Sequence, residues 1–152
     1  MTEFLDLFSN YILLSALAAW FLAQVLKVIF YSIKHRTINL ERLVGSGGMP
    51  SSHTATVVAL TVAVARLEGI DSTMFAIAFI LACVVMYDAT GIRRAAGEQA
   101  KVLNKLMFEH HEDEEPMNAE KVLKELLGHT PLEVFGGAIL GVIVAFLLPM
   151  SM

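Results

Sequence analysis

The chain has few charged residues, a single cysteine and no signal-peptide pattern. Only 17% of its 152 residues are charged, and Cys83 has no second cysteine with which to form an intrachain disulfide. The first residues lack a basic start and a small-residue cleavage site, so we expect the first apolar segment to remain in the mature protein. There is also no internal repeat. We therefore expect one domain over residues 1–152.

Apolar residues dominate what is present. They make up 56% of the chain, and the mean hydropathy is +0.63, which favours a lipid bilayer as the solvent. The excess lies in four runs, at residues 11–33, 54–67, 73–89 and 132–150. The first and last approach the roughly 20 residues that span hydrocarbon, whereas the second is short for a full crossing. We expect an all-α, polytopic membrane helix bundle with about four transmembrane helices and additional cytoplasmic amphipathic helices.

The basic residues predict how this bundle is oriented. Of the eleven Lys and Arg residues, only Arg66 lies outside two segments, the end of run one with its following loop and the stretch between runs three and four. By the positive-inside rule both segments face the cytoplasm. We therefore expect an integral protein of the cell (inner) membrane whose two termini are both extracytoplasmic.

Residues 95–128 form a polar stretch, which we interpret as a cytoplasmic insertion. Residues 95–108 have apolar positions at helical spacing and predict an amphipathic helix at the membrane interface. A second short helix is predicted over 118–127, ended by Gly128. Between them, residues 109–115 mix histidines with carboxylates, which is compatible with a metal site but more typical of a solvated loop.

Two histidines lie where polar loops turn into apolar runs. They are His53 in Pro50-Ser51-Ser52-His53 and His129 in Gly128-His129-Thr130-Pro131-Leu132-Glu133. A helix N-terminus directs unsatisfied N–H groups and the positive end of its dipole outward, so two such ends could hold a phosphate or another oxyanion. The charge pattern places both on the same, cytoplasmic membrane face.

The surrounding residue types suit phosphoryl transfer. That reaction needs fixed positive charge around the phosphoryl oxygens, an in-line nucleophile and an acid for the leaving oxygen. A neutral His129 could attack phosphorus if Glu133, four residues further on, orients its ring, and His53 could then protonate the leaving group. We expect no metal or other cofactor. The candidate phosphate ligands are Lys27, Lys34, Ser51, Ser52, Arg93 and Arg94.

This pattern resembles the type-2 phosphatidic acid phosphatase and vanadium haloperoxidase superfamily, and most closely its divergent membrane branch. The superfamily pattern is Lys, six residues, Arg-Pro; then Pro-Ser-Gly-His; then Ser-Arg, five residues, His, three residues, Asp. Here Lys27 precedes Lys34 by the same spacing, residues 50–53 resemble the second block, residues 91–94 the start of the third, and residues 129–133 its end.

The resemblance covers residues 24–141 and implies the same roles: His129 as nucleophile, Glu133 as its orienter, His53 as general acid, and the basic residues as phosphate ligands. It also implies that the four runs correspond to the last four helices of a six-helix family core. The chain departs from the pattern at several positions, with Lys34 for Arg-Pro, Ser52 for Gly, Glu133 for Asp, and more than thirty residues between Arg94 and His129 where the family has five. A long loop closes at small entropic cost, so this insertion affects fold less than activity.

Each candidate also has a structural interpretation. Thr130 and Glu133 form a capping-box pattern with proline at the first helical position. Ser51 or Ser52 could serve only as an N-cap, and the histidines could be polar interface residues. The cluster of Lys27, Lys34 and Arg36 could be no more than a positive-inside anchor.

The sequence thus predicts a metal-independent phosphatase that acts on a lipid phosphate or diphosphate through a phosphohistidine at the cytoplasmic membrane face. A soluble phosphoester is an alternative substrate. The main alternative function is a catalytically degenerate protein of the same fold that binds, scaffolds or transports phospholipid; vanadate-dependent halide oxidation is a third. We expect membrane lipid as the partner, no nucleic acid, and a contact between copies through the Gly137/Gly141 helix face, although such a pattern more often reflects close helix packing.

Overall fold

A computed structural model describes residues 7–36, 48–109 and 129–150, and these residues contain helices and no strand. A 3-10 turn, η1 (Leu7–Ser9), precedes the first long helix. The helices are α2 (Tyr11–His35), α3 (Ser52–Glu68), α4 (Thr73–Thr90), α5 (Ile92–Glu109) and α6 (Pro131–Leu147). The predicted all-α class is confirmed, and each apolar run forms a helix.

Short polar side chains start four of these helices. In each case the side-chain oxygen of the N-cap residue accepts the backbone N–H three residues further on, which satisfies one of the orphan donors of the first turn. The caps are Asn10, Ser51, Ser72 and Thr130. These residues stand where apolar runs begin, so the sequence itself defines the start of each helix.

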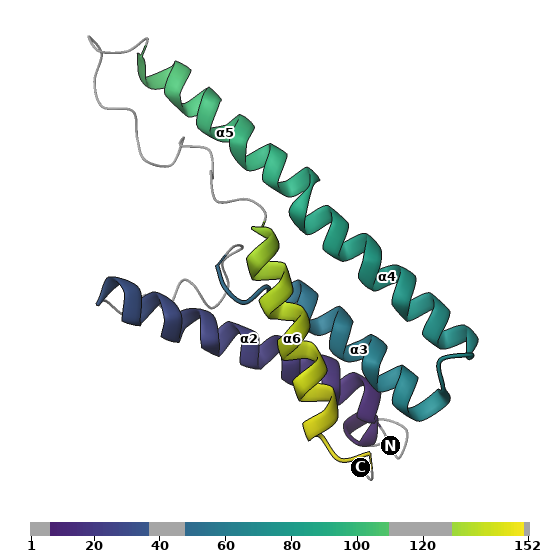
Figure 1. The fold of residues 1–152 in the computed structure, drawn as a ribbon. Coiled ribbons are helices and arrows are strands. Elements are labelled where there is room, and N and C mark those ends of the chain that lie inside the picture. Colours follow the sequence, from purple (N-terminus) through teal and green to yellow (C-terminus); the bar gives the residue numbers. More distant parts are fainter. Residues whose placement is uncertain (1–6, 37–47, 110–128, 151–152) are drawn as a thin grey trace.

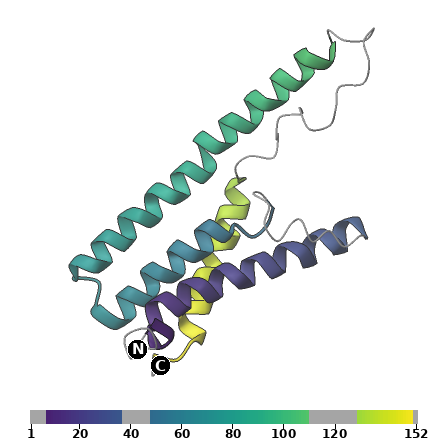
Figure 2. The same cartoon turned by 180° about the vertical axis from the view of Figure 1, so that it is seen from behind.

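Helix α3 is the centre of the bundle (Figures 1 and 2) and packs against α2, α4 and α6. Helix α6 also contacts α2 and α4, whereas α2 and α4 do not contact each other in the described part of the chain. Small side chains line the contact of α2, α3 and α6, because they allow the backbones to approach closely. This core contains Ala19, Ala23, Ala55, Ala59, Val144 and Ala145.

The two glycines of α6 lie at the closest of these approaches. A Cβ on Gly141 would stand 2.6 Å from the carbonyl oxygen of Ala55, and one on Gly137 would overlap the carbonyl oxygen of Ser51. Both glycines are buried against α3 of the same chain. The Gly-x-x-x-Gly face, for which we expected a contact between copies, thus packs closely against α3 within the chain.

Two stretches of the described chain are long and apolar enough to cross a membrane, residues 11–33 and 73–106. Helices α3 and α6 have 17 residues each, so each is about 25 Å long at 1.5 Å per residue, somewhat less than the hydrocarbon thickness. Run four is therefore shorter than the sequence predicted, because α6 ends before Pro149.

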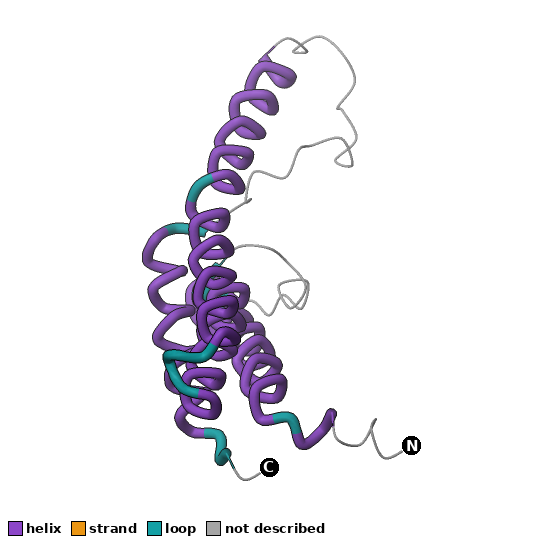
Figure 3. Tube along the Cα trace, turned by 90° about the vertical axis from the view of Figure 1, so that its right-hand side faces the viewer, coloured by secondary structure: helices purple, strands orange, loops and turns teal. Residues whose placement is uncertain are grey.

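Helix α5 continues in nearly the same direction as α4 and projects beyond the other helices (Figures 1 and 3). The break between the two is at Gly91, whose N–H bonds to the carbonyl of Tyr87. The predicted helix over 95–108 is confirmed, with Val102, Leu103 and Leu106 exposed along it. The loop 109–115 beyond its first residue, the predicted helix 118–127 and Gly128 lie outside the described residues.

Candidate phosphate site

Three helix ends meet at one end of the bundle, and two backbone hydrogen bonds join them. The N–H of Ser51, the N-cap of α3, donates to the carbonyl of Glu133 in the first turn of α6 at 2.9 Å. The N–H of His129, just before α6, donates to the carbonyl of Ala89 in the last turn of α4, also at 2.9 Å. The starts of α3 and α6 are thus held together beside the end of α4, as the sequence predicted for the two histidine motifs.

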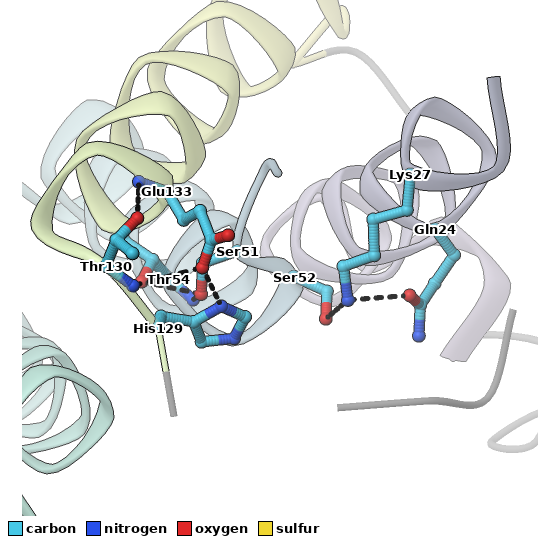
Figure 4. Close-up of polar contacts among 8 residues, drawn as sticks. All are labelled: Gln24, Lys27, Ser51, Ser52, Thr54, His129, Thr130 and Glu133. Atoms are coloured by element: carbon cyan, nitrogen blue, oxygen red, sulfur yellow. Dashed lines mark hydrogen bonds and ion pairs between the residues drawn. The ribbon is translucent and has the colours of Figure 1, made fainter. Parts of the chain in front are cut away.

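Glu133 forms both of the contacts that the sequence presented as alternatives (Figure 4). Its Oε2 accepts the backbone N–H of Thr130 at 3.0 Å, which completes the capping box, and lies 3.1 Å from Nδ1 of His129. The His129 side chain is only 3% exposed. A carboxylate beside Nδ1 favours the tautomer with the proton on that nitrogen, so the lone pair is on Nε2. Capping and ring orientation therefore come from a single oxygen.

His53 lies across from His129. The two ring centroids are 6.2 Å apart and the ring planes are inclined by 60°. His53 is the second residue of α3, directly after the capped turn, and it is exposed, whereas His129 is buried. One histidine is thus held rigidly by its carboxylate and the other faces the surface, an asymmetry that suits a nucleophile and a proton donor.

Lys27 brings a positive charge to the start of α3. Its ammonium group donates to Oγ of Ser52 at 3.1 Å and to Oε1 of Gln24 at 3.0 Å, and the residue is only 4% exposed. Both acceptors are neutral. The Glu133 carboxylate acts on this charge electrostatically without a hydrogen bond to it, so the ammonium group can still stabilise an anion bound between them.

Ser51, which precedes Ser52, has a different role. The Ser51 hydroxyl oxygen accepts the N–H of Thr54 at 3.3 Å and the Thr54 hydroxyl at 3.0 Å (Figure 4). The N-cap interpretation is thus confirmed for Ser51 but does not describe Ser52, whose hydroxyl contacts Lys27 instead. Since both acceptor positions of Ser51 are used, the remaining capacity of its hydroxyl is as a donor.

The structure brings together six of the nine residues that the sequence proposed for the site; five lie at the starts of α3 and α6, and Lys27 reaches the start of α3 from about two turns before the end of α2. These six are Lys27, Ser51, Ser52, His53, His129 and Glu133. For the other three the backbone alone is described: Lys34 is in the last turn of α2, and Arg93 and Arg94 are in the first turn of α5. Their side chains are outside the described part of the molecule.

Sequence reasoning missed Gln24 and Thr54. Gln24 is a polar residue one turn before Lys27 in an apolar run, and Thr54 follows Ser51 by three residues, the spacing of an N-cap partner. Each of these three-residue spacings could have indicated, from the sequence alone, that the two side chains are in contact. The carbonyl of Ala89 had no such signal, because a backbone acceptor is independent of side-chain identity.

The fold and this site define a class: an all-α membrane protein in which two histidines and a lysine meet at helix ends. The chain belongs to the Divergent PAP2 family, whose model matches residues 8–144. It is also 46% identical to the uncharacterized membrane protein YuiD of Bacillus subtilis (strain 168), over 95% of this chain and 97% of that protein. The family resemblance and the membrane location are therefore confirmed. No solved structure gives a significant match to the chain.

Proposed function

We propose that this protein is a metal-independent phosphohydrolase that acts on a phosphate or diphosphate carried by a membrane lipid. The observation that carries the proposal is the buried His129, whose Nδ1 lies 3.1 Å from Glu133 Oε2 while His53 lies across from it. Membership in a divergent branch of a phosphatase family supports the same chemistry. Its location would be the inner membrane, with the site facing the cytoplasm and both termini outside.

The proposed reaction has two steps. In the first, Nε2 of His129 forms a bond to phosphorus while the bond from phosphorus to the lipid oxygen breaks, and the protonated ring of His53 gives its proton to that oxygen. In the second, neutral His53 takes a proton from water, whose oxygen attacks the phosphohistidine and releases inorganic phosphate. Both histidines then regain their starting protonation states.

Charge stabilisation comes from the groups around the two rings. Lys27 supplies a fixed positive charge beside Ser52, and the Ser51 hydroxyl can donate to a phosphoryl oxygen. The first turn of α3 adds the positive end of a helix dipole. We propose Lys34, Arg93 and Arg94 as further ligands on their positions at the ends of α2 and the start of α5. Such preorganised donors stabilise the charge that develops in transfer.

A catalytically degenerate lipid-phosphate binder, scaffold or transporter is the second candidate. One contact favours it: the ammonium group of Lys27 already donates to Gln24 and Ser52, so it could serve a passive cradle. Both functions need the same anion site, and only turnover separates them.

The test is release of inorganic phosphate from a panel of lipid phosphates and diphosphates by the purified, detergent-solubilised chain with EDTA present. We expect wild type to release phosphate and His129→Ala and His53→Ala to lose at least about a thousandfold of that rate, since each removes a reacting group. His35→Ala, which changes the exposed histidine at the end of α2, is the matched control and retains activity. Phosphate binding without turnover in folded wild type would favour the binder.

A further inference from the structure

One face of α3 runs from the candidate site toward an apolar cavity near the other end of the bundle. This face carries His53, Thr56, Leu60 and Val64, which follow one another at helical spacing. Helices α2 and α4 flank α3 on either side of it without touching each other in the described chain. We call this face of α3, with the facing sides of α2 and α4, the groove; α3 is its floor, α2 and α4 are its walls, and all three helices line a cavity within it.

The cavity lies at the end of this groove that is remote from His53. It has a volume of about 360 Å³, and α2, α3 and α4 all contribute to its lining. Most of the lining side chains are apolar, among them Leu13, Leu60, Val64, Ile77 and Leu81, while Asn10 and Glu68 belong to the ends of their helices. The volume is within the range of small-molecule sites, and an apolar lining of this kind suits hydrocarbon.

Helix α2, which forms one wall, changes along its length as α3 does, from apolar beside the cavity to polar beside the candidate site. Its Leu13 lines the cavity, and Trp20, Gln24 and Lys27 follow on the same side of the helix at spacings of three to seven residues. Because α2 and α3 run in opposite directions (Figure 1), Leu13 is beside the cavity end of α3 and Lys27 is beside Ser52. The site end of the groove is thus polar, and its other end is mostly apolar, with Asn10 and Glu68 at the helix ends beyond.

The length of the groove matches one leaflet. From His53 to Val64 the helix rises about 16 Å at 1.5 Å per residue, which is close to half of the roughly 30 Å hydrocarbon thickness. A lipid whose phosphate lies at the helix ends would therefore carry one chain to the depth of the cavity.

We propose that this groove holds one hydrocarbon chain of a membrane phospholipid or lipid phosphate, with its phosphate at Lys27, His53 and His129. The inference rests on the proposed function for the position of the phosphate, and it adds a chain site formed by α2, α3 and α4. A lipid bound in this way is held by its chain as well as by its headgroup, so affinity rises with chain length until the chain fills the cavity.

The test compares butyl phosphate with dodecyl phosphate as probes, using equilibrium binding to the detergent-purified full chain. Wild type is expected to bind dodecyl phosphate at least about tenfold more tightly than butyl phosphate, which corresponds to a few buried methylene groups. Leu60→Trp fills the groove floor and should remove this preference while leaving the affinity for butyl phosphate unchanged. Leu81→Trp, on the exposed wall of α4, should do the same and serves if the first variant does not fold.

Ile139→Trp is the matched control, since Ile139 is exposed on α6 and does not line the cavity. It should keep the full preference. Retention of the preference in both groove variants would overturn the chain site.

Turnover of the two probes is measured in parallel. The expected binding pattern without hydrolysis would overturn the proposed phosphatase activity but not the groove. Equal binding of the two probes, with hydrolysis of both, would overturn the groove but not the phosphatase activity.

Discussion

The two ends of the bundle use a cation in different ways: Lys27 at the site end is buried, and Arg66 at the opposite end is half-buried. At the end opposite the site, Arg66 of α3 donates to the hydroxyl of Tyr11 and to the carbonyl of Ala145, and its guanidinium group lies over the rings of Tyr11 and Phe146. Tyr11 also donates to the same carbonyl. The cation there joins α2, α3 and α6, and it caps a carbonyl in the last turn of α6 that has no partner within the helix.

At the site end, backbone hydrogen bonds join α3, α6 and α4, and a side-chain bond from Lys27 to Ser52 adds α2. The bonds from Ser51 to Glu133 and from His129 to Ala89 connect α3, α6 and α4, and Gly137 allows α6 to approach α3 closely. Lys27 bonds only to neutral side chains within its own helix and at the start of α3. The two histidine side chains at the site end are therefore not needed to hold α3, α6 and α4 together, whereas the side chains of Arg66 and Tyr11 at the other end do join helices.

Among the residues that frame the two ends, the largest expected effect is at Glu133. In Glu133→Gln the side-chain oxygen can still accept the N–H of Thr130, but the negative charge beside His129 is lost. We expect a folded protein whose phosphate release falls by roughly a hundredfold or more, because a neutral amide neither fixes the tautomer nor stabilises the charged ring. The measurement is turnover, with the melting temperature as the check on folding. Wild-type turnover in this variant would remove Glu133 as the orienting residue.

The next largest effects are expected at Lys27 and Arg66, which are compared by replacing each with methionine. Lys27→Met removes a charge whose burial is costly and whose hydrogen-bond acceptors are neutral, so the melting temperature should change little, whereas phosphate affinity and turnover should fall by roughly tenfold. Arg66→Met removes charge-assisted bonds and ring contacts, which should cost about 2 kcal/mol of stability and leave the turnover of folded protein unchanged.

The measurements are thermal unfolding in detergent and steady-state phosphate release for both variants. Loss of turnover in Arg66→Met at a temperature where it is folded would contradict the claim that Arg66 stabilises the fold and takes no part in the reaction. A drop in melting temperature for Lys27→Met comparable to that of Arg66→Met would contradict the expected difference between the two cations.

The sequence predicted the site end much better than the opposite end. His53 and His129 stand next to proline and capping residues, and helix starts have strong local signals that can be read one segment at a time. The contact of Arg66 with Tyr11 and Ala145 depends on how three helices pack, and a lone basic residue in an apolar run has no local pattern that identifies its partners. The separation of α2 from α4, and hence the groove, is tertiary information of the same kind.

The neighbour of the Gly137/Gly141 face could not be predicted from the sequence for a related reason. A Gly-x-x-x-Gly pattern indicates that a helix packs closely against another helix, but the pattern is the same whether the neighbour is in the same chain or in a second copy. Gly137 and Gly141 face α3, whose small residues Ala55 and Ala59 complete the contact. The pattern therefore predicted the packing correctly and could not identify the partner.

The smallest expected effect distinguishes two adjacent glycines and tests whether the site end depends on its backbone. A methyl group on Gly137 would overlap the carbonyl oxygen of Ser51, so Gly137→Ala must displace the start of α3 relative to α6. On Gly136 the nearest atom is Cε of Met49 at 3.1 Å, the flexible end of an exposed side chain that can move away. We expect Gly137→Ala to lose about 1 kcal/mol of stability and to lower turnover, because the Ser51 to Glu133 bond shifts, while Gly136→Ala changes neither.

Thermal unfolding and phosphate release of the two variants give the comparison. Equal behaviour of the pair would mean that α3 and α6 adjust easily at this end, and the rigid backbone frame around His129 would then have to be abandoned.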